Sequence, residues 1–289
     1  MPLIHLGCAM WTLPQWRSTF FPAALSANQH LSYYSQHYTS VEGNSTFYAL
    51  PSDETFKKWS NSVSEGFKFC FKLPREITHE RHLHDVAELM QAYLTRLSPL
   101  IQKQQLGKVF VQLPPNFSAA QSPALVEFIQ TYKKQLPLAV EVRHPEFFNK
   151  SESERELNRL LMAHNIDRVM IDTRPVHTEK ADNPATIDAQ KKKPKLPVHV
   201  LATGQHPIVR FIGQMQTEQN MAFIQPWLAH FKQWIAQGRQ PFLFIHSADN
   251  ANVHALAALW QQMLQPILEQ QPFANDFSSL VPATQNSLF

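Results

Sequence analysis

Glycine and cysteine are scarce in this chain, and their scarcity limits the function classes that the sequence allows. Seven glycines stand against 21 prolines in 289 residues. Neither Gly-x-Gly-x-x-Gly nor Gly-x-x-x-x-Gly-Lys-Ser/Thr occurs, which weakens any dinucleotide- or nucleoside-triphosphate-binding interpretation. A Gly-x-Ser-x-Gly turn is also missing, which disfavours a serine hydrolase. The two cysteines, Cys8 and Cys70, lie in apolar segments. We interpret them as core thiols in a reducing compartment.

Long apolar runs and a strong charge of one sign are missing too. No apolar run is long enough to cross a membrane. The chain begins with a strand-like segment rather than a basic and then apolar leader, so we expect a cytoplasmic protein. The formal charge of +3 is too small to indicate nucleic-acid binding by itself. A composition of 44% hydrophobic and 17% charged residues is typical of a folded core.

What the chain does have is a regular alternation of short strand-like runs with segments of helical period. The eight runs are Ile4–Cys8, Ser40–Glu42, Phe67–Lys72, Val109–Leu113, Leu138–Arg143, Arg168–Asp172, Ile208–Ile212 and Phe242–His246. Apolar residues at 3–4 spacing predict helices around residues 86–97, 224–235 and 256–268. Pro226 is expected to begin or kink the second of these helices. Such alternation implies parallel strands joined by helical crossovers.

Eight strand–helix units in fewer than 300 residues predict an α/β fold, a single-domain (β/α)8 TIM-like barrel. The barrel is expected to span residues 1–269, and residues 270–289 lose helical period and read as an extended tail. A doubly wound open sheet is the structural alternative. Residues 173–207 form a proline-rich insertion with the run Lys191-Lys192-Lys193-Pro194-Lys195. The insertion is either a lid over the active site or a solvated loop with an exposed basic turn.

Polar and charged residues recur where the predicted strands end. In a barrel these ends meet at one mouth, where catalysis takes place. The candidates are Glu42, Asn44, Lys72, His79, Gln112, Glu141, Arg143, His144, Asp172, Arg210 and His246. Each has a structural alternative, such as a buried ion pair, a helix cap or a satisfied core histidine. As a set they favour a ligand site, because a purely structural barrel needs few ionisable groups at one rim.

The mixture of charges predicts the kind of ligand. Lys72, Arg143 and Arg210 can hold phosphate or carboxylate oxygens through charge-assisted hydrogen bonds. Glu42 and Glu141 are the leading acid–base candidates. Further catalytic support is expected from Asp172 and His79, and further ligand contacts from Gln112, His144, Asn44 and His246. We therefore expect an enzyme, of unassigned reaction and nucleophile, that binds a small anionic molecule that is phosphorylated, carboxylated or sugar-like.

A metal site is a weaker alternative at the same place. Glu42, Glu141, Asp172 and His246 could form an oxygen-rich site with one imidazole. Three nearby cations oppose it, so we rank a metal-free anion site above a metal site. No cofactor is firmly implied.

Several of these segments resemble the YecE family of proteins of unknown function. The resemblance rests on residues 41–48 (VEGNSTFY), 69–72 (FCFK), 77–79 (ITH), 112–115 (QLPP), 140–145 (VEVRHP) and 210–213 (RFIG). It covers residues 3–268, and residues 172–177 (DTRPVH) point to the YecE-like branch. The resemblance implies a TIM-like barrel and no established reaction, substrate or cofactor. Gly43 and the segment His246–Asp249 depart from the pattern of many relatives, so substrate choice is expected to differ within the family.

The end of the chain suggests a different class of function. Gln285, Leu288 and Phe289 form a Gln-x-x-Leu-Phe pattern, similar to the peptides by which bacterial DNA-maintenance proteins dock on the sliding clamp. Two apolar anchors would enter a pocket while the glutamine fixes the register. In that case the rim would hold a nucleic-acid phosphate, with Lys191–Lys195 adding non-specific affinity. The alternative is a tail that packs its last two residues on the barrel.

Overall fold

Parallel strand pairing runs almost completely around a barrel in the computed structural model, which describes residues 2–268. The order of the strands is β1-β8-β7-β6-β5-β4-β3-β2, and every ladder is parallel. The strands are β1 His5–Cys8, β2 Ser40–Gly43, β3 Lys68–Lys72, β4 Leu106–Gln112, β5 Leu138–Glu141, β6 Asp167–Asp172, β7 Ile208–Ile212 and β8 Phe242–His246. The pairing of β1 with β8 confirms the predicted TIM-like barrel and excludes the open doubly wound sheet.

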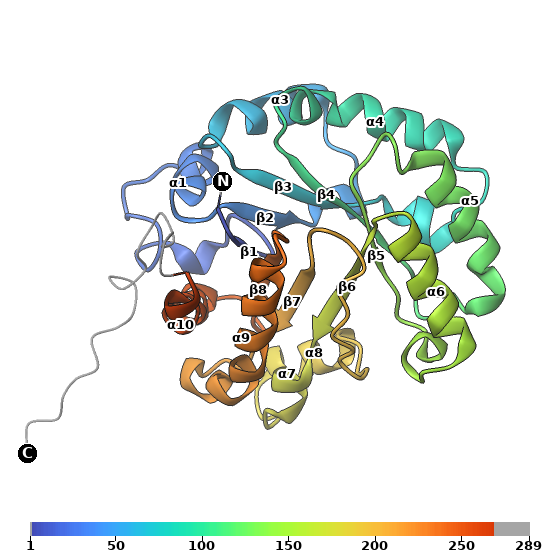
Figure 1. Cartoon of the computed structure of the whole chain (residues 1–289). Helices are drawn as coiled ribbons and strands as arrows, with labels where there is room; N and C mark the ends of the chain where they lie inside the picture. Colours follow the sequence, from blue (N-terminus) through green and yellow to red (C-terminus); the bar gives the residue numbers. More distant parts are fainter. Residues whose placement is uncertain (1, 269–289) are drawn as a thin grey trace, which may run out of the picture.

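The crossovers place helices around the outside of this sheet (Figure 1). They are α1 His30–His37, α2 Ser45–Tyr48, α3 Asp53–Ser62, α4 Ala87–Gln102, α5 Ser122–Tyr132, α6 Glu152–Ala163, α7 Arg174–Thr178, α8 Pro184–Lys192, α9 Met221–Ala236 and α10 Val253–Leu264. Short 3-10 turns lie at Pro14–Trp16, Ala27–Gln29, Ala119–Gln121, Pro145–Phe148, Thr217–Asn220 and Gln265–Ile267, with a π turn at Glu76–Glu80. The three helices expected from periodicity are present as α4, α9 and α10, and Pro226 lies inside α9.

The seam between β1 and β2 closes the barrel without a ladder. Thr39 donates its backbone N–H to the Leu6 carbonyl at 3.2 Å, and the Leu6 N–H reaches the Thr39 hydroxyl at 2.9 Å. The buried Tyr34 hydroxyl accepts from the Cys8 N–H at 2.7 Å and donates to the Ser40 carbonyl at 3.1 Å. These bonds satisfy the backbone groups that an open edge would leave unpaired.

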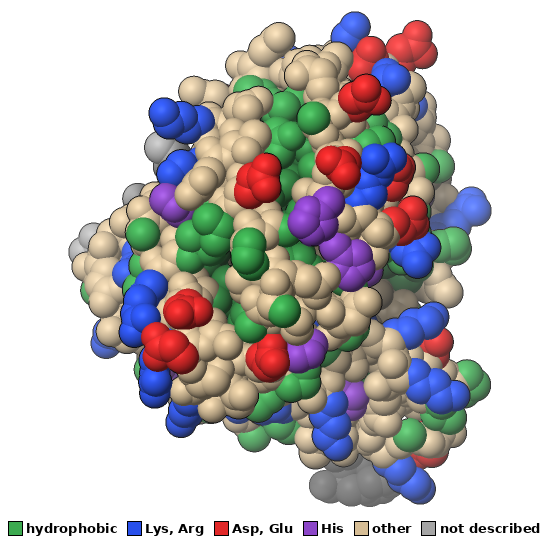
Figure 2. Space-filling model, turned by 90° about the vertical axis from the view of Figure 1, so that its right-hand side faces the viewer, with side chains coloured by type: hydrophobic (Ala, Val, Ile, Leu, Met, Phe, Trp, Pro, Cys, Tyr) green, Lys and Arg blue, Asp and Glu red, His purple; other side chains and the backbone are tan. Residues whose placement is uncertain are grey.

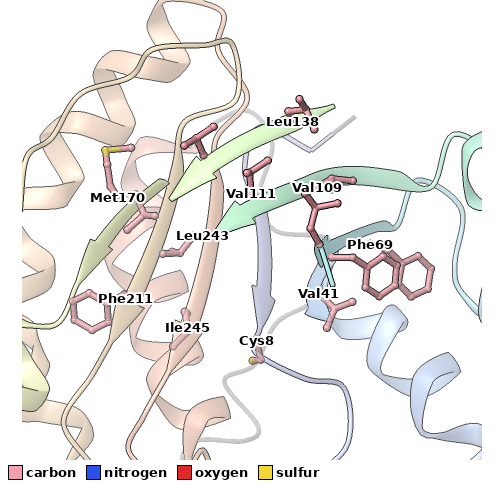
Figure 3. Close-up of a cluster of buried hydrophobic side chains, with 14 of the residues drawn as sticks. Cys8, Val41, Phe69, Val109, Val111, Leu138, Met170, Phe211, Leu243 and Ile245 are labelled. Carbon is pink, nitrogen blue, oxygen red and sulfur yellow. The ribbon is translucent and has the colours of Figure 1, made fainter. Parts of the chain in front are cut away.

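The apolar core lies between the strands and the surrounding helices. Alternate strand positions send apolar side chains outward, and Figure 3 labels ten of them, from all eight strands, in one buried cluster. The opposite face carries a second buried cluster inside the barrel, formed by Cys70, Phe110, Ala139, Val169, Ile208, Phe242 and Phe244. Where a polar residue follows this inner cluster along a strand, it therefore lies at the mouth.

The insertion at residues 173–207 is partly helical. It contains α7 and α8, followed by a segment without regular structure up to β7. Gln190 in α8 donates to the carbonyls of Val176 and Glu179, both at 2.8 Å, which ties the two helices together. The Thr173 hydroxyl donates to the Pro194 carbonyl at 2.7 Å and holds the end of α8 beside the end of β6.

One face of the molecule mixes charges of both signs. On the face seen in Figure 2, Lys and Arg side chains are interspersed with Asp, Glu, His and apolar side chains. No helix among the described residues 2–268 combines the length and the apolar character that a membrane span requires.

Candidate functional site

Strand alternation brings six polar side chains together above the inner apolar cluster. Cys70, Phe110, Ala139, Ile208 and Phe244 face the barrel interior, so the residues two positions further along face it as well. Those residues, with the equivalent position of β2, are Glu42, Lys72, Gln112, Glu141, Arg210 and His246. All six are buried, and all were candidates from the sequence.

Arg210 stands between the two glutamates at the centre of this group. Its Nε and Nη2 donate to Glu42 Oε2 and Oε1 at 2.7 and 2.8 Å, a bidentate pair. Its Nη1 donates to Glu141 Oε2 at 2.7 Å. All three side chains are buried, and geometry of this quality is what a buried ion pair needs to offset its desolvation.

The remaining carboxylate oxygens have further partners. Lys72 Nζ lies 3.5 Å from Glu42 Oε1, and His246 Nε2 lies 3.2 Å from Glu42 Oε2. Arg143, just beyond β5, contacts Glu141 Oε1 through both Nε and Nη2 at 2.9 Å. Each glutamate is therefore shared between Arg210 and at least one other basic group.

This environment keeps both carboxylates ionised at neutral pH. Burial is the largest single effect and favours the neutral form, but Arg210, His246 and Lys72 together outweigh it and hold the pKa of Glu42 well below its usual range. For Glu141, burial is outweighed by the combined charges of Arg210, Arg143 and Lys72, which lower its pKa to about 2. Carboxylates bound in this way are poor proton acceptors near neutral pH, and their clear effect is to fix Arg210.

Lys72 is buried, and nearby arginines offset the effect of the two glutamates on its charge. Burial and then the Arg210 guanidinium lower the pKa of Lys72 to about 8, although Glu42 and Glu141 act in the opposite direction. The ammonium group lies 5.9 Å from the centre of the Phe47 ring. The Thr46 hydroxyl donates to the Lys72 carbonyl at 2.7 Å, which fixes the backbone at the strand end.

His79 lies at the edge of the same group. It belongs to the π turn Glu76–Glu80, its ring packs edge-on to Phe47 at 5.0 Å, and its Nδ1 is 2.8 Å from the Thr78 hydroxyl. Burial and the charges of Arg143, Arg75 and Lys72 lower the pKa of His79 to about 4. Burial also lowers the pKa of His246 to about 4, against the pull of Glu42. Both imidazoles are thus neutral at pH 7.

Gln112 contributes a buried polar atom with no partner. The side chain is 5% exposed, and its Oε1 makes no hydrogen bond to any of the described residues. Gln112 is paired in register with Glu141 on the neighbouring strand, so both face the mouth. A buried acceptor without a donor carries a free-energy cost, and a bound molecule with a hydroxyl or amine group would remove that cost.

The structure adds one residue that the sequence had not singled out. Lys193, just after α8, is half-buried rather than exposed, and its charge interacts with those of Arg210, Glu42, Arg143 and Glu141. Burial, followed by Arg210, lowers its pKa to about 8, and Glu42 and Glu141 act in the opposite direction. The Lys191–Lys195 run was the only sequence signal, and it did not distinguish this lysine from its exposed neighbours Lys191 and Lys192.

Asp172 lies on the other face of its strand. Its neighbour Ile171 is in register with Arg210, so Ile171 has the inward position and Asp172 the outward one. Asp172 Oδ2 accepts from Arg174 at 2.7 Å and from Trp227 Nε1 at 2.9 Å. This corrects the expectation that Asp172 joins the other charges at the mouth.

Asn44 and His144 make local bonds that fit their structural alternatives. Asn44 Nδ2 donates to the Ala9 carbonyl at 2.9 Å and ties the ends of β1 and β2 together. His144 Nδ1 accepts from the Glu146 N–H at 3.4 Å, at the start of a 3-10 turn. Neither is bonded to Arg210 or to the two glutamates that surround it. Gln285, Leu288 and Phe289 lie outside the described residues.

Metal coordination finds no support in the arrangement of these groups. Within residues 2–268, no cluster of three or more His, Cys, Asp or Glu side chains is placed to hold a metal ion. The oxygens of Glu42 and Glu141 are directed at Arg210, Arg143 and Lys72 instead. Three cations at these distances would oppose the entry of a divalent cation.

Fold and site together define a TIM-like barrel whose mouth holds an Arg210-centred ion cluster with an excess of cations. Comparison with known proteins gives the family. Residues 5–277 match the model described as "Protein of unknown function DUF72". The UPF0759 protein YecE of Escherichia coli K12 is 38% identical over 268 residues, which is 92% of this chain and 95% of the relative. The chain belongs to the DUF72 family, which confirms the resemblance to YecE.

Solved structures of two family members support the same architecture. A DUF72 family protein from Thermotoga maritima superposes with a TM-score of 0.68 at 22% identity, covering 91% of this chain and 99% of that one. A second, from Enterococcus faecalis, gives a TM-score of 0.69 at 18% identity, with 91% and 95% covered. At these identities the likeness concerns the fold.

Proposed function

We propose that the mouth of the barrel binds a small anionic molecule, carrying a phosphate or carboxylate group with or without a sugar-like part, and that the protein is an enzyme acting on it. The observation that carries this proposal is the charge balance. Four cations, Lys72, Arg143, Lys193 and Arg210, surround only two carboxylates. A buried excess of positive charge is unfavourable until an anion enters.

The free donors of these groups suggest how an anion is held. Arg143 uses Nε and Nη2 for Glu141, which leaves its Nη1 for a ligand, and its side chain is 17% exposed. Lys72 contributes a second cation, whose ammonium group lies 5.9 Å from the centre of the Phe47 ring. In this arrangement Glu42 and Glu141 orient the arginines, and proton transfer falls to groups that are less tightly bound, such as His79. The acid–base role expected for the two glutamates therefore becomes a positioning role in this proposal.

Thermal unfolding in the presence of inorganic phosphate, citrate and a panel of phosphorylated metabolites tests the proposal. A ligand that binds only the folded state raises Tm with concentration. We expect Arg143→Ala to remove most of that increase. Arg159→Ala is the matched control, because Arg159 is also paired with a glutamate, Glu152, but lies on the surface with 67% of its side chain exposed.

Two results would contradict anion binding. One is an unchanged Tm for the wild-type chain at every anion concentration. The other is an equal increase in the Arg143→Ala and Arg159→Ala variants, which would place the anions outside the mouth. Phosphate stabilises many proteins weakly through exclusion from their surfaces, and the Arg159→Ala control accounts for that contribution.

Docking on a sliding clamp is a second proposal, and it rests on the sequence pattern of Gln285, Leu288 and Phe289 alone. A clamp pull-down compares the full chain with a form that lacks the last two residues. Capture of the full chain only is the expected result, and equal capture of both forms would rule out this use of the pattern.

A cytoplasmic location is part of the proposal. Cys8 and Cys70 are both free and buried. Burial raises the pKa of the Cys8 thiol to about 12 and raises that of Cys70 even further. Unreactive core thiols of this kind fit a reducing compartment, where disulfides are rare.

A further inference from the structure

Lys193 is a basic group of the mouth that has no partner among the described residues. Arg210, Arg143 and Lys72 each lie within 3.5 Å of a glutamate oxygen. Lys193 Nζ, in contrast, makes no hydrogen bond or ion pair within residues 2–268, although its side chain is half-buried and its charge interacts with those of Arg210, Glu42, Arg143 and Glu141. An amine in this position is not held as an ammonium ion by a carboxylate.

The chain nevertheless fixes Lys193 in place. The Lys193 N–H donates to the Ala189 carbonyl at 2.8 Å, and the Lys193 carbonyl lies 3.3 Å from His177 Nε2. The next residue, Pro194, accepts from the Thr173 hydroxyl. Thr173 follows directly after β6, so the backbone of Lys193 is attached to a strand end of the barrel. A side chain that is positioned from the backbone but free at its tip is suited to react with a bound molecule.

We propose that Lys193 forms an imine with an aldehyde or ketone group of the anionic molecule held at the mouth. This inference rests on the proposed anion site and names its substrate class: a small carbonyl compound with a carboxylate or phosphate group. Arg143 and Lys72 hold the anionic end, and the carbonyl carbon faces the amine. Desolvation and neighbouring cations are the established means by which proteins make a lysine nucleophilic.

The step is balanced without an outside oxidant or reductant. The nitrogen lone pair forms a bond to the carbonyl carbon, and the C=O π electrons move to oxygen, which takes up a proton. The nitrogen loses a proton, giving a carbinolamine. Protonation of its hydroxyl group then releases water and leaves the C=N bond. The positive charge on the protonated imine replaces that of the former ammonium group, so the charge balance of the mouth is preserved.

Lys193 fits this task better than Lys72. The Lys72 amine has Glu42 Oε1 at 3.5 Å, which favours its protonated form, and it belongs to the network that fixes Arg210. Both amines have a pKa of about 8, but only Lys193 can use its lone pair without giving up an ion pair. At pH 7.5 about a quarter of such amines are neutral, against about one in a thousand for an ordinary lysine.

Glyoxylate, the smallest aldehyde with a carboxylate, is the probe for the test. The full chain is treated with limiting glyoxylate and cyanoborohydride at pH 7.5, and the reduced adduct is located by peptide mass spectrometry. We expect Lys193 to be modified roughly tenfold faster than Lys191 or Lys195, because the gain in neutral amine exceeds the loss of intrinsic nucleophilicity. Lys191 and Lys195 are matched controls from the same run and are exposed.

The outcomes separate this inference from the anion site itself. Modification of Lys193 at the rate of Lys191 and Lys195, or none at all, overturns the imine. If phosphate still raises Tm in the same preparation, the anion site stands and only the covalent step is lost. Inorganic phosphate should slow the labelling of Lys193 and leave Lys195 unaffected. In Lys193→Met the fast adduct should disappear, and in Lys195→Met it should remain.

Discussion

At the scale of a single residue, Arg210 determines the shape of the mouth. Its guanidinium group fills the space between β2 and β5 by bonding to Glu42 and Glu141, and the three side chains are nearly inaccessible to solvent. A lysine would supply one point charge in place of the planar fork that matches two carboxylates at once. The position therefore needs the shape of arginine as well as its charge.

Replacing Arg210 should damage stability far more than replacing a surface arginine. Arg210→Met would leave two buried carboxylates without their main partner, and we expect the free energy of unfolding to fall by about 3–5 kcal/mol. Arg159→Met, which removes a surface pair with Glu152, should cost no more than about 1 kcal/mol. Urea denaturation measures both. Equal, small losses in the two variants would mean that the buried network contributes little to folding.

At the scale of elements, the sequence predicts much of the architecture because strand alternation is local. The apolar positions of each run and the polar ones between them already place Glu42, Lys72, Glu141 and Arg210 on inward faces, and the structure agrees. The same rule does not decide the position of Asp172, because β6 carries apolar residues on both faces, with Val169 and Ile171 inward and Met170 outward. Nearness to a strand end therefore does not by itself bring a side chain to the mouth.

Lys193 could not be found in the same way. Its place depends on tertiary contacts: the Thr173 bond to the Pro194 carbonyl, and the bonds from Gln190 that join α7 to α8. These connect residues many positions apart in a segment with no strand period. Composition makes the run Lys191–Lys195 look uniformly solvated, whereas folding turns one of its lysines inward.

At the scale of the whole molecule, closure of the barrel is what turns separate strand ends into one site. Gly7 allows β1 to approach β2 closely, because an added Cβ would lie 2.3 Å from the Ser40 carbonyl oxygen. The sequence alone does not show that position 7 requires glycine, because the clash would be with Ser40, 33 positions further along the chain. With the seam closed, Glu42 from β2 lies within reach of Arg210 from β7 and His246 from β8.

The whole molecule also carries a set of buried neutral histidines that should govern its response to acid. Burial lowers the pKa of His5 to about 3, of His246 to about 4 and of His254 to about 3. His5 Nδ1 and His254 Nε2 have no partner among the described residues, so a proton on either would be a buried donor without an acceptor. In the unfolded chain the same imidazoles have a pKa near 6.5.

The sign of the pH effect follows from this difference. Between about pH 6.5 and pH 4 the unfolded chain binds protons that the folded chain does not, so acidification destabilises the fold. Each such histidine lowers the free energy of unfolding by at most about 1.4 kcal/mol for each pH unit of acidification. This loss begins well above the pH range in which carboxylates titrate. We expect the urea midpoint to fall steadily from pH 7 to pH 5.

A variant of His254 tests the assignment. The buried ring of His254 is stacked on Phe20 at 3.7 Å, so His254→Asn should lower the free energy of unfolding. The same variant should also make that free energy depend less steeply on pH, by the contribution of about one proton. His84→Asn, at an exposed position, should leave the slope unchanged. A midpoint independent of pH in this range would show that these imidazoles take up protons in the folded protein as readily as in the unfolded chain.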